Sequence, residues 1–289
     1  MMNVSQSSLA ETNHPWSNAL KLAKSSVTAP EFVIDNLIST GAVAIAGYRG
    51  VGKTSSVLPL VMLATHLVEN EHLKATIRRK VFYISEDPEQ VLRIIEAMFR
   101  KGVIKGTKIE LDKMLQIIPA KRIQPHRIAE FIQTTQEDKC ANKRADSTYY
   151  HAPPVVVLDT VNATVDLDNV NDNSEVSRAI SKIRAGAIDA NIIFVGHVSK
   201  STKANLHNTS FMGAGAWEND TQQTLYLSME GRNRSLSMGK KRFECQITDY
   251  RIEPIRVTLT TQDKLGQDIQ LDTVFGRFTP LTAEDKAKA

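Results

Sequence analysis

The sequence predicts an α/β protein in which a mostly parallel, twisted sheet is flanked by helices. Up to about residue 200, short apolar runs alternate with segments whose apolar residues recur at helical spacing, which favours crossover connections and parallel strands. After residue 224, strand-like segments follow one another across short polar turns, which predicts antiparallel strands added at the C-terminal end. With 289 residues, 42% of them hydrophobic, the chain is long enough for one large core.

The domain organisation is predicted from composition along the chain. Residues 1–28 are polar and serine-rich, so we expect a flexible N-terminal tail, then one domain over 29–280 and a flexible C-terminal tail over 281–289. The two cysteines, Cys140 and Cys245, lie far apart and lack metal-ligand spacing. They give no support to a disulfide framework or a zinc site, and a reducing compartment fits best.

Hydropathy and charge narrow the class of protein. No stretch approaches the roughly 20 apolar residues that would span a bilayer, so we expect a cytoplasmic protein without a membrane partner. The net charge of +4 is a small excess of 36 basic over 32 acidic side chains. This excess points only weakly to nucleic acid, because many enzymes share it.

A strand, a glycine turn and a helix are expected in sequence from residue 41. The run "GAVAIAG" (41–47) is typical of a strand buried on both faces, and segment 55–70 places apolar residues at helical spacing. Pro59 lies inside this helix, where it removes a backbone hydrogen bond and is expected to kink the second turn.

The strand and helix alternation continues to residue 200. Further strands are expected at 80–85, 115–120, 155–160 and 191–197, and helices at 89–102, 126–135 and 174–190. Pro88 fits the first turn of the first of these helices, and Ser174 could cap the last. The charged, proline-bounded segment 136–154 is expected to be a surface loop. The later strands are expected at 224–229, 242–250, 254–261 and 268–278.

The glycine turn fits the pattern G-x-x-x-x-G-K-[ST] through Gly47, Gly52, Lys53 and Thr54. Glycines allow the backbone to curl so that several N–H groups face one concave site, the following helix adds positive potential, and Lys53 supplies a full charge. A polyphosphate fits such a site, and Thr54 is expected to bind a Mg²⁺ ion that bridges its outer phosphates. The predicted cofactor-binding residues are Gly47, Tyr48, Arg49, Gly50, Val51, Gly52, Lys53, Thr54 and Ser55.

Two acidic positions at strand ends complete a predicted hydrolytic site. Asp159 follows the apolar run "VVVL", so the sheet would bring its carboxylate to the edge where ligands bind, near Mg²⁺. Glu86 closes the strand "VFYIS" and is the candidate group that orients the attacking water, if this strand lies next to the one before the glycine turn. Asp87 is its rival, and an acidic helix start favoured by the dipole is the alternative interpretation of "EDPE".

His197 ends the strand "IIFVG" and is expected to reach the same edge. There its imidazole could hydrogen-bond the terminal phosphate and change partner after hydrolysis. The following segment, 199–217, is glycine-bearing and poor in apolar residues, so we expect it to move. Its Lys200 and Lys203 are candidates for contact with a nucleic-acid backbone or a second subunit, and ordinary solvated charge is the alternative.

Five stretches together resemble the RecA-like ATPase core and, more narrowly, the RepA-type hexameric replicative helicases of small plasmids and their relatives among mobile-element ATPases. They cover about residues 30–225 and read "GAVAIAGYRGVGKT", "VFYISEDPEQVLRI", "VVVLDTVN", "SEVSRAISKIRAGAIDANIIFVGHVSK" and "FMGAGAWEND". The resemblance implies ATP and Mg²⁺ as cofactors, with Glu86 as catalytic glutamate, Asp159 in the Mg²⁺ shell and His197 as phosphate sensor. It also implies a homo-oligomeric ring, usually of six subunits, with single-stranded DNA in the central channel.

The sequence departs from that family in two places. Family members insert a basic finger into the neighbouring site, yet residues 218–224 read "ENDTQQT", which leaves Arg251 and Arg242 as candidates. The stretch after Asp159, "VNATVDLDNVNDNSE", is acidic where a DNA-facing loop should be basic. These departures favour the alternative of a nucleotide-switched assembly protein that moves nothing. A small-molecule kinase would need an arginine-rich lid, and loop 136–154 offers only Arg144.

Overall fold

The computed structural model describes residues 31–135, 137–186, 190–198, 215–231, 233–241, 249–262 and 264–282. The chain divides into two compact units, Met1–Pro30 and Glu31–Ala289, and all described residues belong to the second. None of the helices in the described ranges is long and apolar enough to cross a membrane.

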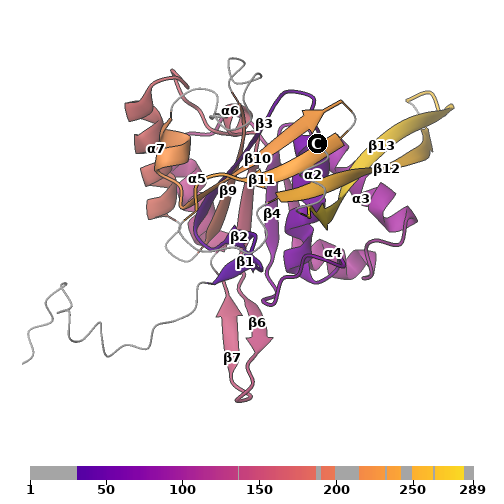
Figure 1. The fold of residues 1–289 in the computed structure, drawn as a ribbon, viewed down its shortest axis with the longest axis horizontal. Coiled ribbons are helices and arrows are strands. Elements are labelled where there is room, and N and C mark those ends of the chain that lie inside the picture. Colours follow the sequence, from indigo (N-terminus) through magenta and orange to yellow (C-terminus); the bar gives the residue numbers. More distant parts are fainter. Residues whose placement is uncertain are drawn as a thin grey trace, which may run out of the picture. The chain divides into compact units, whose positions relative to one another are not determined.

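A nine-stranded sheet organises this unit, in the order β13-β12-β11-β10-β3-β9-β8-β4-β5 (Figure 1). The six strands from β10 to β5 are parallel, and the other three are antiparallel. The parallel strands are β3 (Ala42–Gly47), β4 (Val81–Ser85), β5 (Leu115–Pro119), β8 (Val155–Asp159), β9 (Asn191–His197) and β10 (Gln223–Glu230). The antiparallel strands are β11 (Asn233–Met238), β12 (Asp249–Gln262) and β13 (Asp268–Pro280). The fold class expected from the sequence is therefore confirmed.

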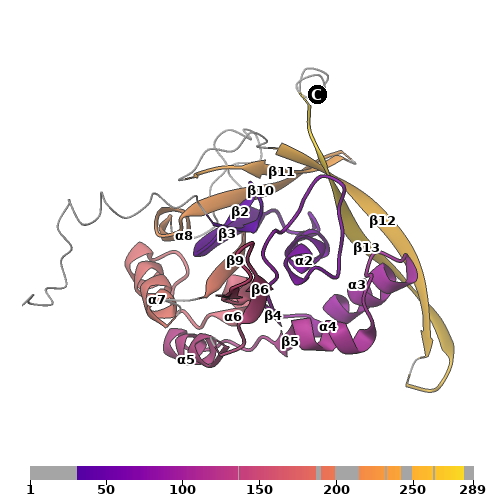
Figure 2. The same cartoon turned by 90° about the horizontal axis from the view of Figure 1, so that it is seen from below.

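Helices cover both faces of the sheet, as Figure 2 shows. One face carries α2 (Lys53–Met62), α3 (Pro88–Arg100) and α4 (Lys108–Met114), and the other carries α5 (Pro125–Thr135), α6 (Val161–Thr164), α7 (Asn173–Ala185) and α8 (Ala216–Asn219). Two hydrophobic clusters fill the layers. The long ribbon β12–β13 curves over α2 and α3, where Phe275 and Phe278 are buried in the first cluster (Figure 2). The apolar surface buried in both layers holds the parallel strands in register.

Several local expectations were wrong. Segment 224–229 lies in β10, which pairs parallel to β3 rather than antiparallel, because the chain reaches it through a crossover that contains α8. Helix α2 contains Pro59 but ends at Met62, not at residue 70 as expected. A 3₁₀ turn, η1 (Leu63–Thr65), follows it.

The expected surface loop 136–154 contains a hairpin of β6 (Cys140–Lys143) and β7 (Tyr149–Ala152). Its polar, alternating strands carry no apolar run that would have revealed them. A smaller hairpin, β1 (Phe32–Ile34) with β2 (Ile38–Ser39), was also not predicted.

Helix starts follow their capping groups. As expected, Pro88 lies in the first turn of α3. Ser174 does not cap α7; Asp172 does, through Oδ1, which accepts hydrogen bonds from the N–H groups of Ser174 and Glu175. Helix α4 was missed, although its Thr107 and Glu110 form a capping box.

Candidate functional site

Four parallel strands deliver polar groups to one edge of the sheet. In the strand register Gly47 at the end of β3 lies opposite His197 at the end of β9, and Ser85 at the end of β4 lies opposite Asp159 at the end of β8. The N–H of Glu86 donates to the backbone oxygen of Asp159 at 2.9 Å. The carboxyl edge therefore gathers the predicted turn, histidine and carboxylates, as expected for an open parallel sheet.

The strand carrying Glu86 is not where the sequence suggested. Strand β4 is separated from β3 by β9 and β8. Crossover connections allow strands that follow one another in the chain to lie apart in the sheet. Glu86 still lies at the site, because it directly follows Ser85, which is level with Asp159.

The glycine turn has a backbone that only glycine adopts easily. Gly50 and Gly52 have φ angles of +84° and +85°, in the left-handed region. A methyl group at Gly52 would lie 2.7 Å from Ser55 Oγ, which itself donates to Gly52 O at 3.0 Å. Helix α2 begins at Lys53 with no side-chain cap and no acidic residue in its first turn. Its first N–H groups thus remain available to an anion at the turn.

Lys53 is almost buried beside this turn, with 8% of its surface exposed. Its Nζ lies 3.2 Å from the carbonyl oxygen of Tyr48, 3.4 Å from that of Gly47 and 3.1 Å from Nδ1 of His197. Burial lowers the pKa of Lys53, and the charges of Asp159 and Glu86 only partly offset this effect. The ammonium group is directly bonded by neutral acceptors alone, so an anion at the turn would stabilise it.

His197 is neutral at pH 7. Burial, followed by the charges of Lys53 and Arg49, lowers its pKa from 6.5 to about 4. Because a neutral ring carries one acceptor and one donor nitrogen, Nδ1 accepts from the Lys53 ammonium and Nε2 carries the hydrogen.

Asp159 is fully buried, and among the described residues only one of its two carboxylate oxygens has hydrogen-bond partners. Its Oδ2 accepts from Thr54 Oγ1 at 2.7 Å and from the Tyr83 hydroxyl at 2.6 Å. Its Oδ1 is buried with no hydrogen-bond partner among the residues described. Burial raises the pKa of Asp159, although the hydrogen bonds from Tyr83 and Thr54 oppose this shift. A buried carboxylate oxygen without a partner is costly, and a cation beside it would remove that cost.

These donors fit Mg²⁺ held jointly with a phosphate. Mg²⁺ commonly binds one or two carboxylates together with waters and substrate phosphates, and does not need a full protein cage. The described part of the chain holds no group of three or more histidine, cysteine or acidic side chains that would form such a cage. Thr54 and the free Oδ1 of Asp159 supply the oxygen ligands that a shared ion requires.

Glu86 and Asp87 differ in what they contact. Asp87 caps α3, since its Oδ1 accepts from the N–H of Gln90 at 2.8 Å, and its Oδ2 lies 3.8 Å from Arg93. The pKa of Glu86 is raised by burial and by the charge of Asp159, with Lys53 and Arg49 opposing. Asp87 therefore has the helix-cap role considered for "EDPE", while Glu86 interacts electrostatically with the site.

The remaining predicted residues lie at or outside the site. Arg49 is exposed at the turn, and Arg251 is exposed on β12 opposite Ser235. Lys200, Lys203 and Arg242 lie outside the described residues.

Sequence reasoning missed two residues near the turn. Tyr83 sits in the middle of an apolar strand, where a buried hydroxyl requires a partner, and that requirement was the available signal. Arg234 on β11 lies against Gly52, and no local sequence pattern marked it.

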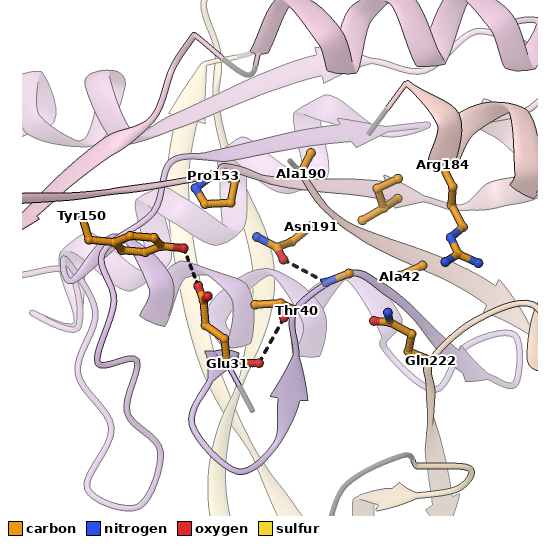
Figure 3. A pocket seen from close by; sticks show the side chains of 11 residues that line it. Glu31, Thr40, Ala42, Tyr150, Pro153, Arg184, Ala190, Asn191 and Gln222 are labelled. Carbon is orange, nitrogen blue, oxygen red and sulfur yellow. Dashed lines mark hydrogen bonds between the residues drawn. The ribbon is translucent and has the colours of Figure 1, made fainter. Parts of the chain in front are cut away.

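A polar pocket of about 410 Å³ lies at the opposite, amino-terminal edge of the sheet (Figure 3). There the Tyr150 hydroxyl donates to Glu31 Oε1 at 2.8 Å, and the N–H of Gly41 donates to Asn191 Oδ1 at 3.0 Å (Figure 3). This pocket does not include the glycine turn, and its carboxylate is already paired.

Three comparisons with known proteins place this chain among its relatives. The RadB recombinase crystal structure aligns with 74% of this chain and 86% of its own, with 14% identity and a TM-score of 0.47. No curated protein matches the sequence. A family model described as an AAA domain matches residues 11–203, which is more than half of the chain. The chain, with its glycine turn and mostly parallel sheet, therefore belongs to this AAA-domain family.

Proposed function

We propose that the protein hydrolyses ATP with Mg²⁺ at the carboxyl edge of the sheet. One observation carries this proposal: Thr54 Oγ1 donates to Asp159 Oδ2 at 2.7 Å, while Asp159 Oδ1 is buried without a hydrogen-bond partner in the part of the chain that the structure describes. That arrangement is suited to a metal ion shared between protein and phosphate.

The roles of the protein groups follow from their contacts. The N–H groups of the turn and the Lys53 ammonium bind the phosphates, and Thr54 and Asp159 hold Mg²⁺. When bound, Mg²⁺ neutralises charge that develops on the phosphates. Glu86 orients the attacking water; its side chain is exposed, and partial desolvation together with the charge of Asp159 raises its pKa.

His197 links the occupied and empty states. In the free protein its Nδ1 accepts from Lys53. Once Lys53 turns to a phosphate, that bond is lost, and the Nε2–H of His197 becomes the group that senses the terminal phosphate. Hydrolysis would restore the Lys53 contact and change the position of the segment that follows His197.

We further propose that the ATPase acts as a ring-forming, RepA-like helicase that moves along single-stranded DNA. The motif resemblance supports this, with Lys200 and Lys203 as DNA contacts and Arg251 or Arg242 as the finger into a neighbouring site. Two acids in the segment after Asp159 have local partners: Asp172 caps α7 and Glu175 accepts from the N–H of Asp168 at 2.6 Å. These two acids therefore have a structural role as well, and their charge remains a point against DNA binding in this segment.

A nucleotide-switched assembly protein is the second candidate, favoured by the acidic segment and by the missing arginine in 218–224. ATP hydrolysis with and without Mg²⁺, compared between the wild type and Thr54→Ala, tests the shared ATPase proposal. Strand separation on forked DNA distinguishes the candidates, because a switch leaves the duplex intact at any ATP concentration. Mass measurement with a non-hydrolysable ATP analogue and labelled single-stranded DNA tests the ring, and a monomer without DNA would contradict it.

A further inference from the structure

Arg234 lies at the height of the glycine turn, on a strand of the antiparallel extension. It pairs with Met229 on β10, two residues beyond Leu227, which is level with Gly47 at the end of β3. Alternate residues of a strand share a face, so Arg234 projects to the same side as Leu236, which is buried in the hydrophobic cluster of α2. Figure 2 shows β10 and β11 adjoining the layer that contains α2.

The guanidinium group packs directly against Gly52, the N-cap residue that precedes α2. A methyl group placed on Gly52 would lie 2.7 Å from Nη1 of Arg234 and 3.1 Å from its Cζ. The glycine at position 52 thus allows the close approach of this cation as well as the positive φ angle of the turn.

Among the residues that the structure describes, Arg234 forms no ion pair. Its Nη1 is buried without a hydrogen-bond partner among the described residues. Burial lowers the pKa of Arg234, and among the described residues the charge that adds to this shift is that of the cationic Arg256. Arg234 is partly exposed, but a buried guanidinium nitrogen without a partner, close to another cation, is unfavourable unless an anion joins it. The adjacent turn is the site proposed to hold phosphates.

The position of Arg234 on the turn indicates which phosphates it meets. Thr54 faces Asp159 and so marks the metal end of the site. The next residue, Ser55, points about 100° away around the helix, and its Oγ lies with Nη1 of Arg234 on the flank of Gly52 toward which a side chain would project, each 2.7 Å from that Cβ position. Because Mg²⁺ and Lys53 serve the outer phosphates, this flank faces the inner ones.

We propose that Arg234 is a phosphate ligand supplied by the same chain, which contacts the diphosphate portion common to ADP and ATP. The inference rests on the proposed ATP site and adds a ligand from the C-terminal strands to it. Nucleotide binding would then stabilise the β11–β13 extension against α2.

Affinity for Mg·ADP and for a non-hydrolysable Mg·ATP analogue tests this assignment in Arg234→Gln. We expect both dissociation constants to rise by a similar factor of roughly 10 to 100, since a charged hydrogen bond is lost in both complexes. The kcat at saturating ATP should change by less than about threefold, because the lost contact stabilises bound ATP and the transition state equally. Arg234→Lys, which keeps the charge but loses the planar fork, should fall between the wild type and Arg234→Gln.

Thermal melting separates ligand binding from a structural role. Without nucleotide, Arg234→Gln should melt no lower than the wild type, because a buried, unpaired charge has been removed. Its rise in Tm on adding Mg·ADP should be smaller than that of the wild type. A lower Tm without nucleotide, combined with normal affinity, would overturn the proposal.

Two further variants make the outcome specific. Arg256→Gln removes the same charge from an exposed position on β12, and it should leave both affinities within about threefold of the wild type. If Arg256→Gln and Arg234→Gln lose the same nucleotide affinity, a long-range electrostatic effect explains the loss, and direct contact by Arg234 is overturned. Lys53→Ala reports on the site itself: if it loses nucleotide while Arg234→Gln binds normally, only the Arg234 assignment fails. If the wild type binds no nucleotide, the proposed function fails.

Discussion

Two clusters of buried charge lie at opposite edges of the same sheet, and they differ in how their charges are balanced. At the amino edge, the fully buried Arg79 donates to Pro153 O at 2.8 Å and forms an ion pair with Glu31, which also accepts from Tyr150. Of the Arg79 nitrogens, only Nε lacks a partner among the described residues.

At the carboxyl edge the balance is incomplete. Lys53 is hydrogen-bonded by neutral groups, and Asp159 Oδ1 and Arg234 Nη1 have no partner in the described part of the chain. Both clusters are buried, so burial alone does not distinguish them. Charges that are balanced within the chain stabilise the fold, whereas charges left unbalanced indicate where a charged ligand binds. Variants at the two edges should therefore affect different measurements.

The largest effect is expected for Lys53→Ala at the carboxyl edge. Loss of the ammonium group removes phosphate binding and stabilisation of developing charge, so kcat/KM for ATP should fall by more than about 10³-fold. Lys80→Ala is the matched control, since Lys80 forms an ion pair with Asp138 before β4. Steady-state hydrolysis measures both, and normal turnover by Lys53→Ala would defeat the site assignment.

Glu86→Gln should reduce kcat by about 10² to 10³-fold while ATP binding is retained, because the group that orients water loses its charge. Asp87→Asn should hydrolyse ATP at close to the wild-type rate, since asparagine also caps helices well. Single-turnover hydrolysis and nucleotide binding compare the two variants. If Asp87→Asn is inactive and Glu86→Gln is active, the choice of base is wrong.

At the amino edge, Arg79→Met should act on stability instead. Removing one member of a buried ion pair costs roughly 3 kcal/mol of unfolding free energy, at the low end of the usual range because Glu31 retains 38% exposure. Urea unfolding measures this loss. At a temperature where the variant remains folded, kcat should match the wild type, and a large fall in kcat would show that the two edges are coupled.

His197→Asn should give a smaller, pH-dependent effect. The pKa of His197 in the folded protein is about 4, below its ordinary value of 6.5, so the unfolded chain binds the proton first as pH falls. Its contribution to stability is present above about pH 6.5 and is lost as pH falls toward 4. Because the ring is only half buried, we expect a loss of about 1 kcal/mol.

The measurement is the difference in unfolding free energy between the wild type and His197→Asn at pH 7 and at pH 4.5. Asp159 and Glu86 have raised pKa values and change stability in the opposite direction. Their contributions largely cancel in this difference. A difference that does not vary with pH would contradict a depressed histidine pKa.

The parallel strands and the site at their carboxyl edge could be predicted from the sequence, because apolar strands and a glycine turn of fixed spacing are local patterns. Asp159, Glu86 and His197 each directly follow or end such a strand, so a parallel sheet brings them to one edge. The order of strands was not predictable in the same way. Glu86 follows β4, which is the third strand along the sheet from β3, the strand before the glycine turn. The crossover connections set this order, and they leave no local signal in the sequence.

Contacts between segments far apart in the chain could not be predicted from the sequence either. Tyr83 meets Asp159 across adjacent strands, and Arg234 meets Gly52 from a strand about 180 residues later in the chain. The hairpin β6–β7 was missed because its strands are short and mostly polar, and only Cys140 and Ala152 in them reach the core. Such features depend on tertiary packing, which overrides local propensity.

A crystal structure with Mg²⁺ and a non-hydrolysable ATP analogue tests the central claim most directly. We predict phosphates against the turn from Gly47 to Thr54, Lys53 moved from His197 to a phosphate, and Mg²⁺ between Thr54 and Asp159. Nucleotide bound in the amino-edge pocket of Figure 3, or Lys53 still bonded to His197 with Asp159 Oδ1 unpaired, would contradict the account.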